Sequence, residues 1–117
     1  MRARAGSACK NDPRIDELAE ALKTLADSSR LRIMCFLLTG ERCVGEVVEE
    51  LGISQQLTSH HLHVLKEAEL LKVCKVGTRS NYSVNTDKLC EISETFGKYL
   101  DYRKAISCCQ RADAGAV

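Results

Sequence analysis

The sequence carries a tight joint at Gly52 between two short amphipathic segments, and few folds accommodate such a joint. Before it, apolar residues recur at helical spacing over residues 44–51. After it, Ser54 is expected to cap a second helix over residues 54–66, whose apolar stripe includes Leu57 and His61. Glycine allows the close turn that two helices at a steep angle require. The pattern predicts a helix–turn–helix pair.

Two further helices are expected before this pair. Asp12-Pro13 is an N-cap followed by proline at the first helical position, and the apolar spacing predicts a helix over residues 13–26. Residues 29–39 contain few polar positions, so the helix there is expected to be buried nearly all round, with Cys35 in the core. Gly40 is the expected stop of that helix.

After the pair, the periodicity changes from helical to strand-like. Residues 71–76 and 80–84 alternate around a turn at 77–79, which predicts a β-hairpin. Thr86 is expected to cap a last, long helix that runs through Ile106. The order is α-α-α-α-β-β-α, a mainly α fold with a β-hairpin wing. A helix–turn–helix followed by a hairpin is the layout of the winged helix-turn-helix.

Length and composition limit the remaining classes. With 117 residues there is room for one domain. It is expected over residues 12–107, between a flexible arm at 1–11 and a flexible, cysteine-containing tail at 108–117. No apolar run approaches the roughly 18 residues of a membrane helix, and the polar start does not resemble a signal peptide. A cytoplasmic protein without a membrane partner is therefore expected.

The second helix of the pair begins with side chains suited to contacting DNA. They are short and hydrogen-bonding, and at a helix start in the major groove they reach base edges and phosphates. Residues 54–82 hold four basic and two acidic residues, although the whole chain is only +1. His61 is expected to pack half-buried, and Arg79 to reach DNA from the hairpin tip. The predicted DNA-binding residues are Ser54, Gln55, Gln56, Thr58, Ser59, His60, Lys66 and Arg79.

The sequence resembles the ArsR/SmtB family of metal-responsive repressors in three runs: LADSSRLRI at 25–33, CVGEV at 43–47 and SQQLTSHHLHVLK at 54–66. The resemblance covers about residues 15–105. It implies a homodimer built on the first and last helices, bound to double-stranded operator DNA that carries an inverted repeat. It further implies that an inducer lowers the affinity for DNA. An enzyme is not expected, because all three histidines, the candidate bases, lie on the proposed recognition helix.

The cysteines depart from the family's best-known inducer sites. Of the Cys-Val-Cys-x-x-Cys run found in arsenic repressors, only Cys43 is present, and residues 89–103 lack the histidine of the zinc-type site. Cys108 and Cys109 form an adjacent pair at the expected end of the last helix, and neighbouring basic residues favour thiolates. Such a pair suits trivalent arsenic or antimony, which forms two or three bonds to sulfur. The candidates for a third thiolate are Cys90, Cys9 and Cys43.

A second sensing chemistry stays open. Cys35 together with a cysteine on the last helix resembles the thiol sensors of persulfide or oxidant in the same family. Those sensors place the second cysteine about two turns before Cys108, near Asp101. Oxidation would join two thiols in a disulfide or polysulfide, whereas binding of a trivalent arsenical needs no oxidant.

Overall fold

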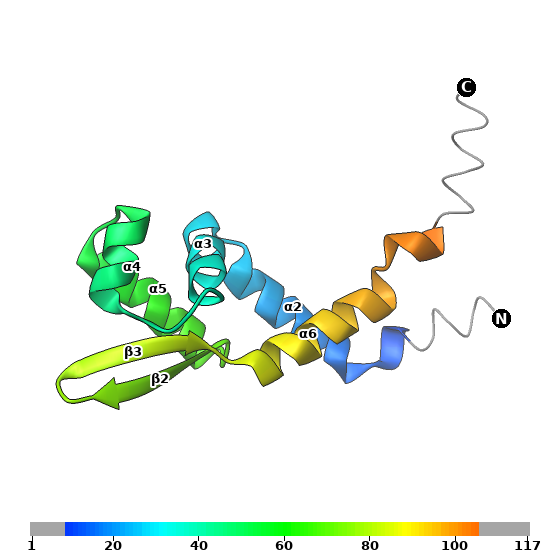
Figure 1. Cartoon of the computed structure of the whole chain (residues 1–117). Helices are drawn as coiled ribbons and strands as arrows, with labels where there is room; N and C mark the ends of the chain where they lie inside the picture. Colours follow the sequence, from blue (N-terminus) through cyan, green and yellow to red (C-terminus); the bar gives the residue numbers. More distant parts are fainter. Residues whose placement is uncertain (1–8, 106–117) are drawn as a thin grey trace, which may run out of the picture.

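The computed structural model describes residues 9–105, and it has the predicted winged helix-turn-helix layout (Figure 1). The elements in order are α2 (Pro13–Leu25), α3 (Ser28–Leu37), β1 (Arg42–Cys43), α4 (Val44–Leu51), α5 (Gln55–Glu67), β2 (Leu71–Val76), β3 (Arg79–Val84), α6 (Thr86–Tyr99) and the 3-10 turn η1 (Tyr102–Ala105). Among these residues, the helices are too short or too polar for one to span a membrane.

The two helices that precede the joint begin at aspartate caps. The Asp12 carboxylate accepts the Arg14 amide at 2.9 Å, and Pro13 occupies the first helical position of α2. The Asp27 carboxylate accepts the amides of Ser29 and Arg30 at 2.8 and 3.1 Å, so α3 begins at Ser28. The predicted start of α2 is confirmed, whereas α3 begins at Ser28, one residue before its predicted start.

The hydrophobic core is formed by one face of each helix. The expectation that α3 is buried nearly all round is wrong. Ile33, Met34 and Leu37 of α3 are buried, but Leu31, Cys35 and Leu38 are exposed. Positions 31, 35 and 38 recur at helical spacing, so they form a single solvent-facing stripe. The apolar composition of α3 does not reveal that only one side of it finds packing partners. Five aliphatic residues have no exposed surface: Ile33, Val47, Leu62, Leu65 and Leu70.

The joint at Gly52 forms as predicted. Gly52 ends α4 with a φ of 69°, a left-handed conformation that glycine adopts without steric cost. The Ser54 hydroxyl then accepts the Leu57 amide at 3.1 Å and starts α5. Because the turn is this short, α4 and α5 pack directly against each other.

The wing is a tighter hairpin than expected and belongs to a larger sheet. Its turn has two residues, Gly77 and Thr78, so Arg79 is the first residue of β3 and not part of the turn. A third strand, β1, pairs antiparallel with β3 and gives the strand order β1-β3-β2. Two residues are too few for a periodicity signal, and the sequence therefore did not predict β1.

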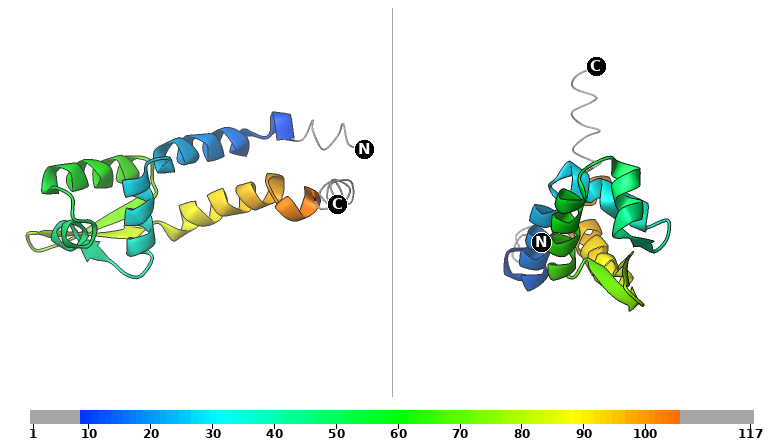
Figure 2. Two further views of the ribbon diagram at one scale, coloured as in Figure 1. Left: turned by 90° about the horizontal axis from the view of Figure 1, so that it is seen from above. Right: turned by 90° about the vertical axis from the view of Figure 1, so that its left-hand side faces the viewer.

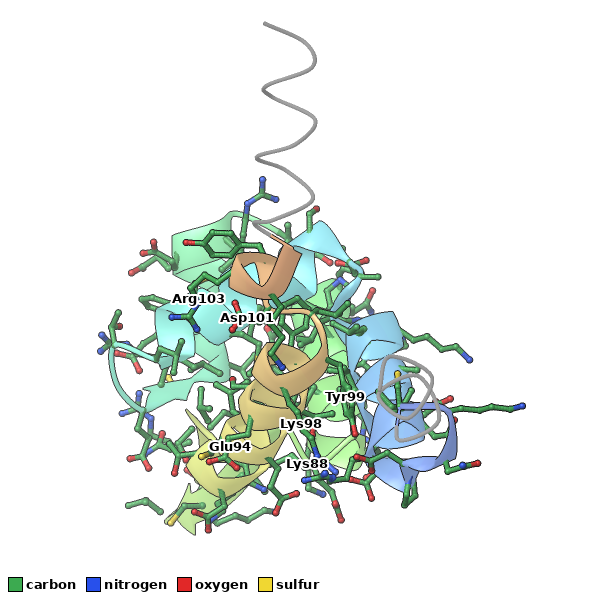
Figure 3. The ribbon with its side chains drawn as sticks, turned by 90° about the vertical axis from the view of Figure 1, so that its right-hand side faces the viewer. Lys88, Glu94, Lys98, Tyr99, Asp101 and Arg103 are labelled. Atoms are coloured by element: carbon green, nitrogen blue, oxygen red, sulfur yellow. The ribbon has the colours of Figure 1, made fainter. Side chains whose placement is uncertain are left out.

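The last helix differs from the prediction at both ends. Its N-cap is Asn85 and not Thr86, because the Asn85 side chain accepts the Lys88 amide at 3.3 Å. It ends at Tyr99 and not near Ile106, since Asp101 accepts the Arg103 amide at 3.0 Å and starts the separate turn η1. Figure 3 shows Asp101 and Arg103 at this break.

The molecule is elongated, with extents of 59 × 35 × 20 Å. Helices α2 and α6 contact each other and run side by side away from the other elements (Figure 2). Helices α4 and α5 and the hairpin lie together at the opposite end (Figure 1). The fold thus separates a helix–turn–helix end from a two-helix end.

Candidate nucleic-acid interface

Helix α5 turns a polar surface outward beside the wing. Its exposed side chains occupy the side opposite the buried face, and the hairpin of β2 and β3 lies at the same end of the molecule (Figure 1). Lys72 and Lys75 on β2 are also exposed there and add positive charge. Seven of the eight predicted DNA-binding side chains are exposed: Ser54, Gln55, Gln56, Ser59, His60, Lys66 and Arg79.

Thr58 is the eighth, and the structure contradicts its assignment. It has no exposed surface, and its hydroxyl donates to the Ser54 carbonyl at 2.8 Å. Leu57, expected on the buried stripe, is instead 43% exposed. The buried face of α5 comprises positions 58, 61, 62 and 65, which follow the i, i+3, i+4, i+7 helical pattern. A polar residue can lie on that face here because the Thr58 hydroxyl has its hydrogen-bond partner within the helix and needs no water.

Arg79 is exposed, and its guanidinium is held at the surface by a contact with Cys43 of the same domain. Its Nη2 donates to the Sγ of Cys43 at 3.0 Å, so the side chain lies back along β1 instead of extending from a hairpin tip. This contact with Cys43 raises the pKa of Arg79. The two residues lie 36 positions apart, and no local pattern in the sequence predicts the contact.

The predicted inducer ligands Cys108 and Cys109 lie outside the described residues. Of the candidate third ligands, Cys90 is exposed on α6, and the neighbouring Glu94 carboxylate raises the pKa of its thiol, which disfavours the thiolate. Cys43 is the residue held by Arg79, whereas Cys9 is partly buried at the two-helix end. Within residues 9–105, no three His, Cys, Asp or Glu side chains converge on a point that could hold a metal ion.

The two-helix end carries an apolar groove of about 310 Å³ between α2 and α6. It is lined by Cys9, Ile15, Leu18, Ala19, Leu22, Tyr99 and Leu100. The Tyr99 hydroxyl donates to Asp12, which ties the end of α6 to the start of α2; Figure 3 shows Tyr99 directed toward that segment. The Arg14 guanidinium, followed by this tyrosine bond, holds the pKa of Asp12 well below its usual range.

Comparison with known proteins agrees with this architecture. Residues 27–73 match the family described as "Bacterial regulatory protein, arsR family". The "Probable mercury resistance operon repressor" of Streptomyces lividans is 34% identical over 98 residues, which cover 82% of this chain and 78% of the relative. The "Arsenical resistance operon repressor" of Staphylococcus aureus is 41% identical over 69 residues, which cover 59% and 66%.

A solved structure extends the likeness to the fold. The homodimeric winged helix-turn-helix DNA-binding domain from Mycobacterium bovis superimposes with a TM-score of 0.61 at 29% identity, over 69% of this chain and 76% of that one. The family match includes α3 and the whole helix–turn–helix, and therefore the exposed polar surface of α5. The chain therefore belongs to the ArsR family, whose members are DNA-binding transcriptional regulators and not enzymes.

Proposed function

We propose that the protein is a homodimeric transcriptional repressor that binds an inverted-repeat operator and leaves it when a trivalent arsenical or antimonial binds its cysteines. The observation that carries the DNA-binding part is the exposed polar start of α5. Gln55 and Gln56 follow directly on the Ser54 cap, where a helix N-terminus presents side chains to base edges. Ser59 and Lys66 continue this surface, and the wing lysines supply phosphate contacts. Arg79 adds a further phosphate contact when its guanidinium leaves Cys43.

The two-helix end supports a homodimer. Leu22 is 41%, Phe96 43% and Leu100 57% exposed, so α2 and α6 leave apolar surface uncovered beside the groove. A second copy placed there would cover these residues and set two α5 helices on neighbouring half-sites of DNA. The winged helix-turn-helix domain from Mycobacterium bovis, which is homodimeric, also supports a homodimer.

For the inducer, we assign Cys108 and Cys109 as thiolate ligands. The arsenical and mercury resistance relatives support a thiophilic inducer. Such elements prefer sulfur over imidazole and carboxylate ligands. In the sequence, Cys108 follows Ala105, the last residue of η1, by three positions.

Among the candidates for a third ligand, the geometry favours Cys9. It lines the groove together with Tyr99 and Leu100, the residues at which α6 ends. Cys90 lies nine residues earlier on α6, about 14 Å along the helix axis from Tyr99. Cys43 is the N-cap of α4 and contacts Arg79 of the wing, and α4 lies at the end of the molecule away from the groove (Figure 1). Cys9 is thus the candidate that lies at the same end of the molecule as the C-terminal end of α6.

The test is fluorescence anisotropy of the reduced protein on a labelled duplex from the DNA upstream of its own coding sequence. Arsenite, methylarsenite, antimonite, cadmium and zinc are titrated into the complex. Wild type should release the DNA with a trivalent arsenical or antimonite, and the Cys108→Ser/Cys109→Ser variant should bind DNA equally well but stay bound. Cys90→Ser is the matched control and should respond as wild type does.

Two outcomes would contradict the proposal at different points. Absence of salt-dependent binding to any duplex would remove the DNA-binding function. Normal release from the Cys108→Ser/Cys109→Ser variant would remove the ligand assignment alone. If Cys9→Ser still releases DNA with methylarsenite but no longer does so with arsenite, Cys9 is supported as the third ligand. Methylarsenite needs only two thiolates, whereas arsenite needs a third.

A thiol-oxidation sensor is the second candidate function, and the exposure of Cys35 favours it. The sequence predicted this cysteine in the core, but its position on the exposed stripe of α3 leaves the thiol open to oxidants. A persulfide donor added to the same DNA complex distinguishes the two chemistries. If only the persulfide donor released the DNA, and Cys35→Ser abolished that release, the protein would be a thiol-oxidation sensor and not an arsenical sensor.

A further inference from the structure

Arg30 connects three elements at the junction between the two ends of the molecule. Its Nη1 donates to the Thr24 carbonyl in the last turn of α2 at 3.2 Å, and its Nε donates to Nδ1 of His61 on α5 at 3.1 Å. The Arg30 amide also donates to the Asp27 cap of α3. One guanidinium therefore links the two-helix end to the helix that carries the DNA-binding surface.

This geometry fixes the protonation state of His61. An arginine side chain has only donors, so the Nδ1 that receives its Nε–H must carry a lone pair. The imidazole is consequently neutral, with its proton on Nε2. His61 is 6% exposed and lies on the buried face of α5. Burial is the main cause that lowers the pKa of His61 and so favours this neutral form.

We propose that Arg30 is a positioning residue for α5, and that protonation of His61 breaks the link and weakens DNA binding. A proton on Nδ1 removes the acceptor of the Arg30 Nε–H and places two cations against each other in a partly buried junction. Arg30 must then withdraw from His61, and α5 loses the polar link that orients it relative to α2 and α3. The proposal depends on the proposed function, because α5 is taken as the recognition helix.

The charges around His61 do not compensate for this change. Asp27 is the one nearby carboxylate that favours the protonated form, while Arg30 and His60 oppose it. One Asp27 oxygen is already engaged by the amides of Ser29 and Arg30, which also lower the pKa of Asp27. Within the described residues, α4 and β2, which also pack on α5, add no further charge that acts on His61.

The expected pH dependence is opposite to that of a DNA-contacting histidine. A histidine that contacts phosphate adds positive charge there when it is protonated, which would strengthen binding as the pH falls. The His61 link predicts weaker binding as the pH falls. The sign of the profile therefore separates a positioning role of His61 from a phosphate contact.

The first experiment uses the free protein, so its result does not depend on DNA binding. Two-dimensional ¹H–¹⁵N spectra of the histidine side chains report the tautomer of His61 and its titration. The proposal expects the Nε2–H tautomer and a pKa below the ordinary value of about 6.5. An Nδ1–H tautomer, or an imidazole already protonated at neutral pH, would overturn the proposal whatever the DNA experiments show.

The second experiment measures affinity for the same labelled duplex at constant ionic strength as the pH falls. Wild type should lose affinity as the pH falls from about 7.5 to about 5.5, across the ordinary histidine pKa of about 6.5, because released α5 binds the His61 proton more tightly than positioned α5 does. His61→Asn keeps an acceptor near the Nδ1 position but does not titrate, so it should bind at neutral pH and show no such loss. Arg30→Lys should bind weakly at both pH values, because lysine lacks the two-directional fork.

Matched controls come from the same helices. Arg32→Lys changes an exposed arginine of α3, and His63→Asn removes an exposed histidine of α5; both should keep the loss at low pH. If His61→Asn loses affinity with falling pH as wild type does, the link is not the source of the effect and the proposal fails. Should no variant or wild type bind any duplex, the proposed function and the positioning role in it fail together, whereas the spectra still test the Arg30–His61 link.

Discussion

The buried hydroxyl of Thr58 and the exposed amide of Gln55 lie less than one turn apart on one helix, α5. Thr58 fills the core face of α5, and the Ser54 carbonyl accepts both its hydroxyl and its backbone amide. Gln55, three positions earlier, is the first residue of α5 and is exposed to solvent. One residue therefore contributes to stability and the other is available to a partner, although both are polar and close in sequence.

We predict that substitutions at these two positions have separate effects. Thr58→Val keeps the shape of the side chain and removes one hydrogen bond, so it should lower the free energy of unfolding by about 1 kcal/mol and leave DNA affinity unchanged. Gln55→Ala should leave stability unchanged and weaken operator binding by about 1–3 kcal/mol. Urea unfolding and anisotropy measure the two quantities. If fully folded Thr58→Val bound DNA more weakly than wild type, Thr58 would have to be a DNA-binding residue after all.

Among the secondary-structure elements, α4 depends on its last turn. The helix has only eight residues, and Gly52 closes it in a left-handed conformation that lets the Ser54 cap of α5 follow two residues later. A Cβ at Gly52 would meet no atom within 4 Å, so a substitution there would cause no clash. Its effect would come from the backbone conformation alone.

Gly52 and Gly45 therefore offer a matched pair of substitutions. Gly52→Ala should cost about 1–2 kcal/mol of stability, because alanine is disfavoured at positive φ. Gly45→Ala, within α4 and equally free of neighbours, should stabilise the protein by up to about 1 kcal/mol. Thermal unfolding followed by circular dichroism gives both values. Equal effects of the same sign at the two positions would contradict the conformational explanation.

The whole molecule places its exposed apolar side chains at more than one location. Leu100 at the groove and Leu38 on α3 are exposed to nearly the same extent, 57% and 58%. The groove between α2 and α6 makes the Leu100 region a continuous apolar surface. Leu38 belongs instead to the short stripe on α3. An interface between copies of the chain is expected at the groove.

Substitution of these two leucines tests that interface. Leu100→Glu should shift the protein from dimer to monomer in light scattering coupled to size-exclusion chromatography, because a carboxylate would be buried in the interface. Leu38→Glu should leave the dimer intact. Neither should unfold the domain, since both side chains are exposed. A dimer disrupted by Leu38→Glu alone would move the interface to α3.

Local chemistry was enough to predict most elements from the sequence. Caps at Asp12 and Ser54, the stop at Gly52 and the strand alternation after residue 70 each depend on residues within four positions of one another. Hydrogen bonds of this range form wherever the segment folds. The element order and the polar surface of α5 follow from such local patterns, and the family resemblance rests on the same residues.

Contacts between distant segments were not predictable in this way. Arg30 reaches His61 across 31 positions and Arg79 reaches Cys43 across 36, and neither pair has a spacing that a helix or strand imposes. The exposed stripe of α3 and the burial of Thr58 likewise depend on which neighbours each helix meets. Periodicity shows that a helix has two faces, but only the packing of α3, α4 and α5 decides how much of each face is covered. Burial and long-range polar contacts are properties of the assembled helices, and a single segment does not contain them.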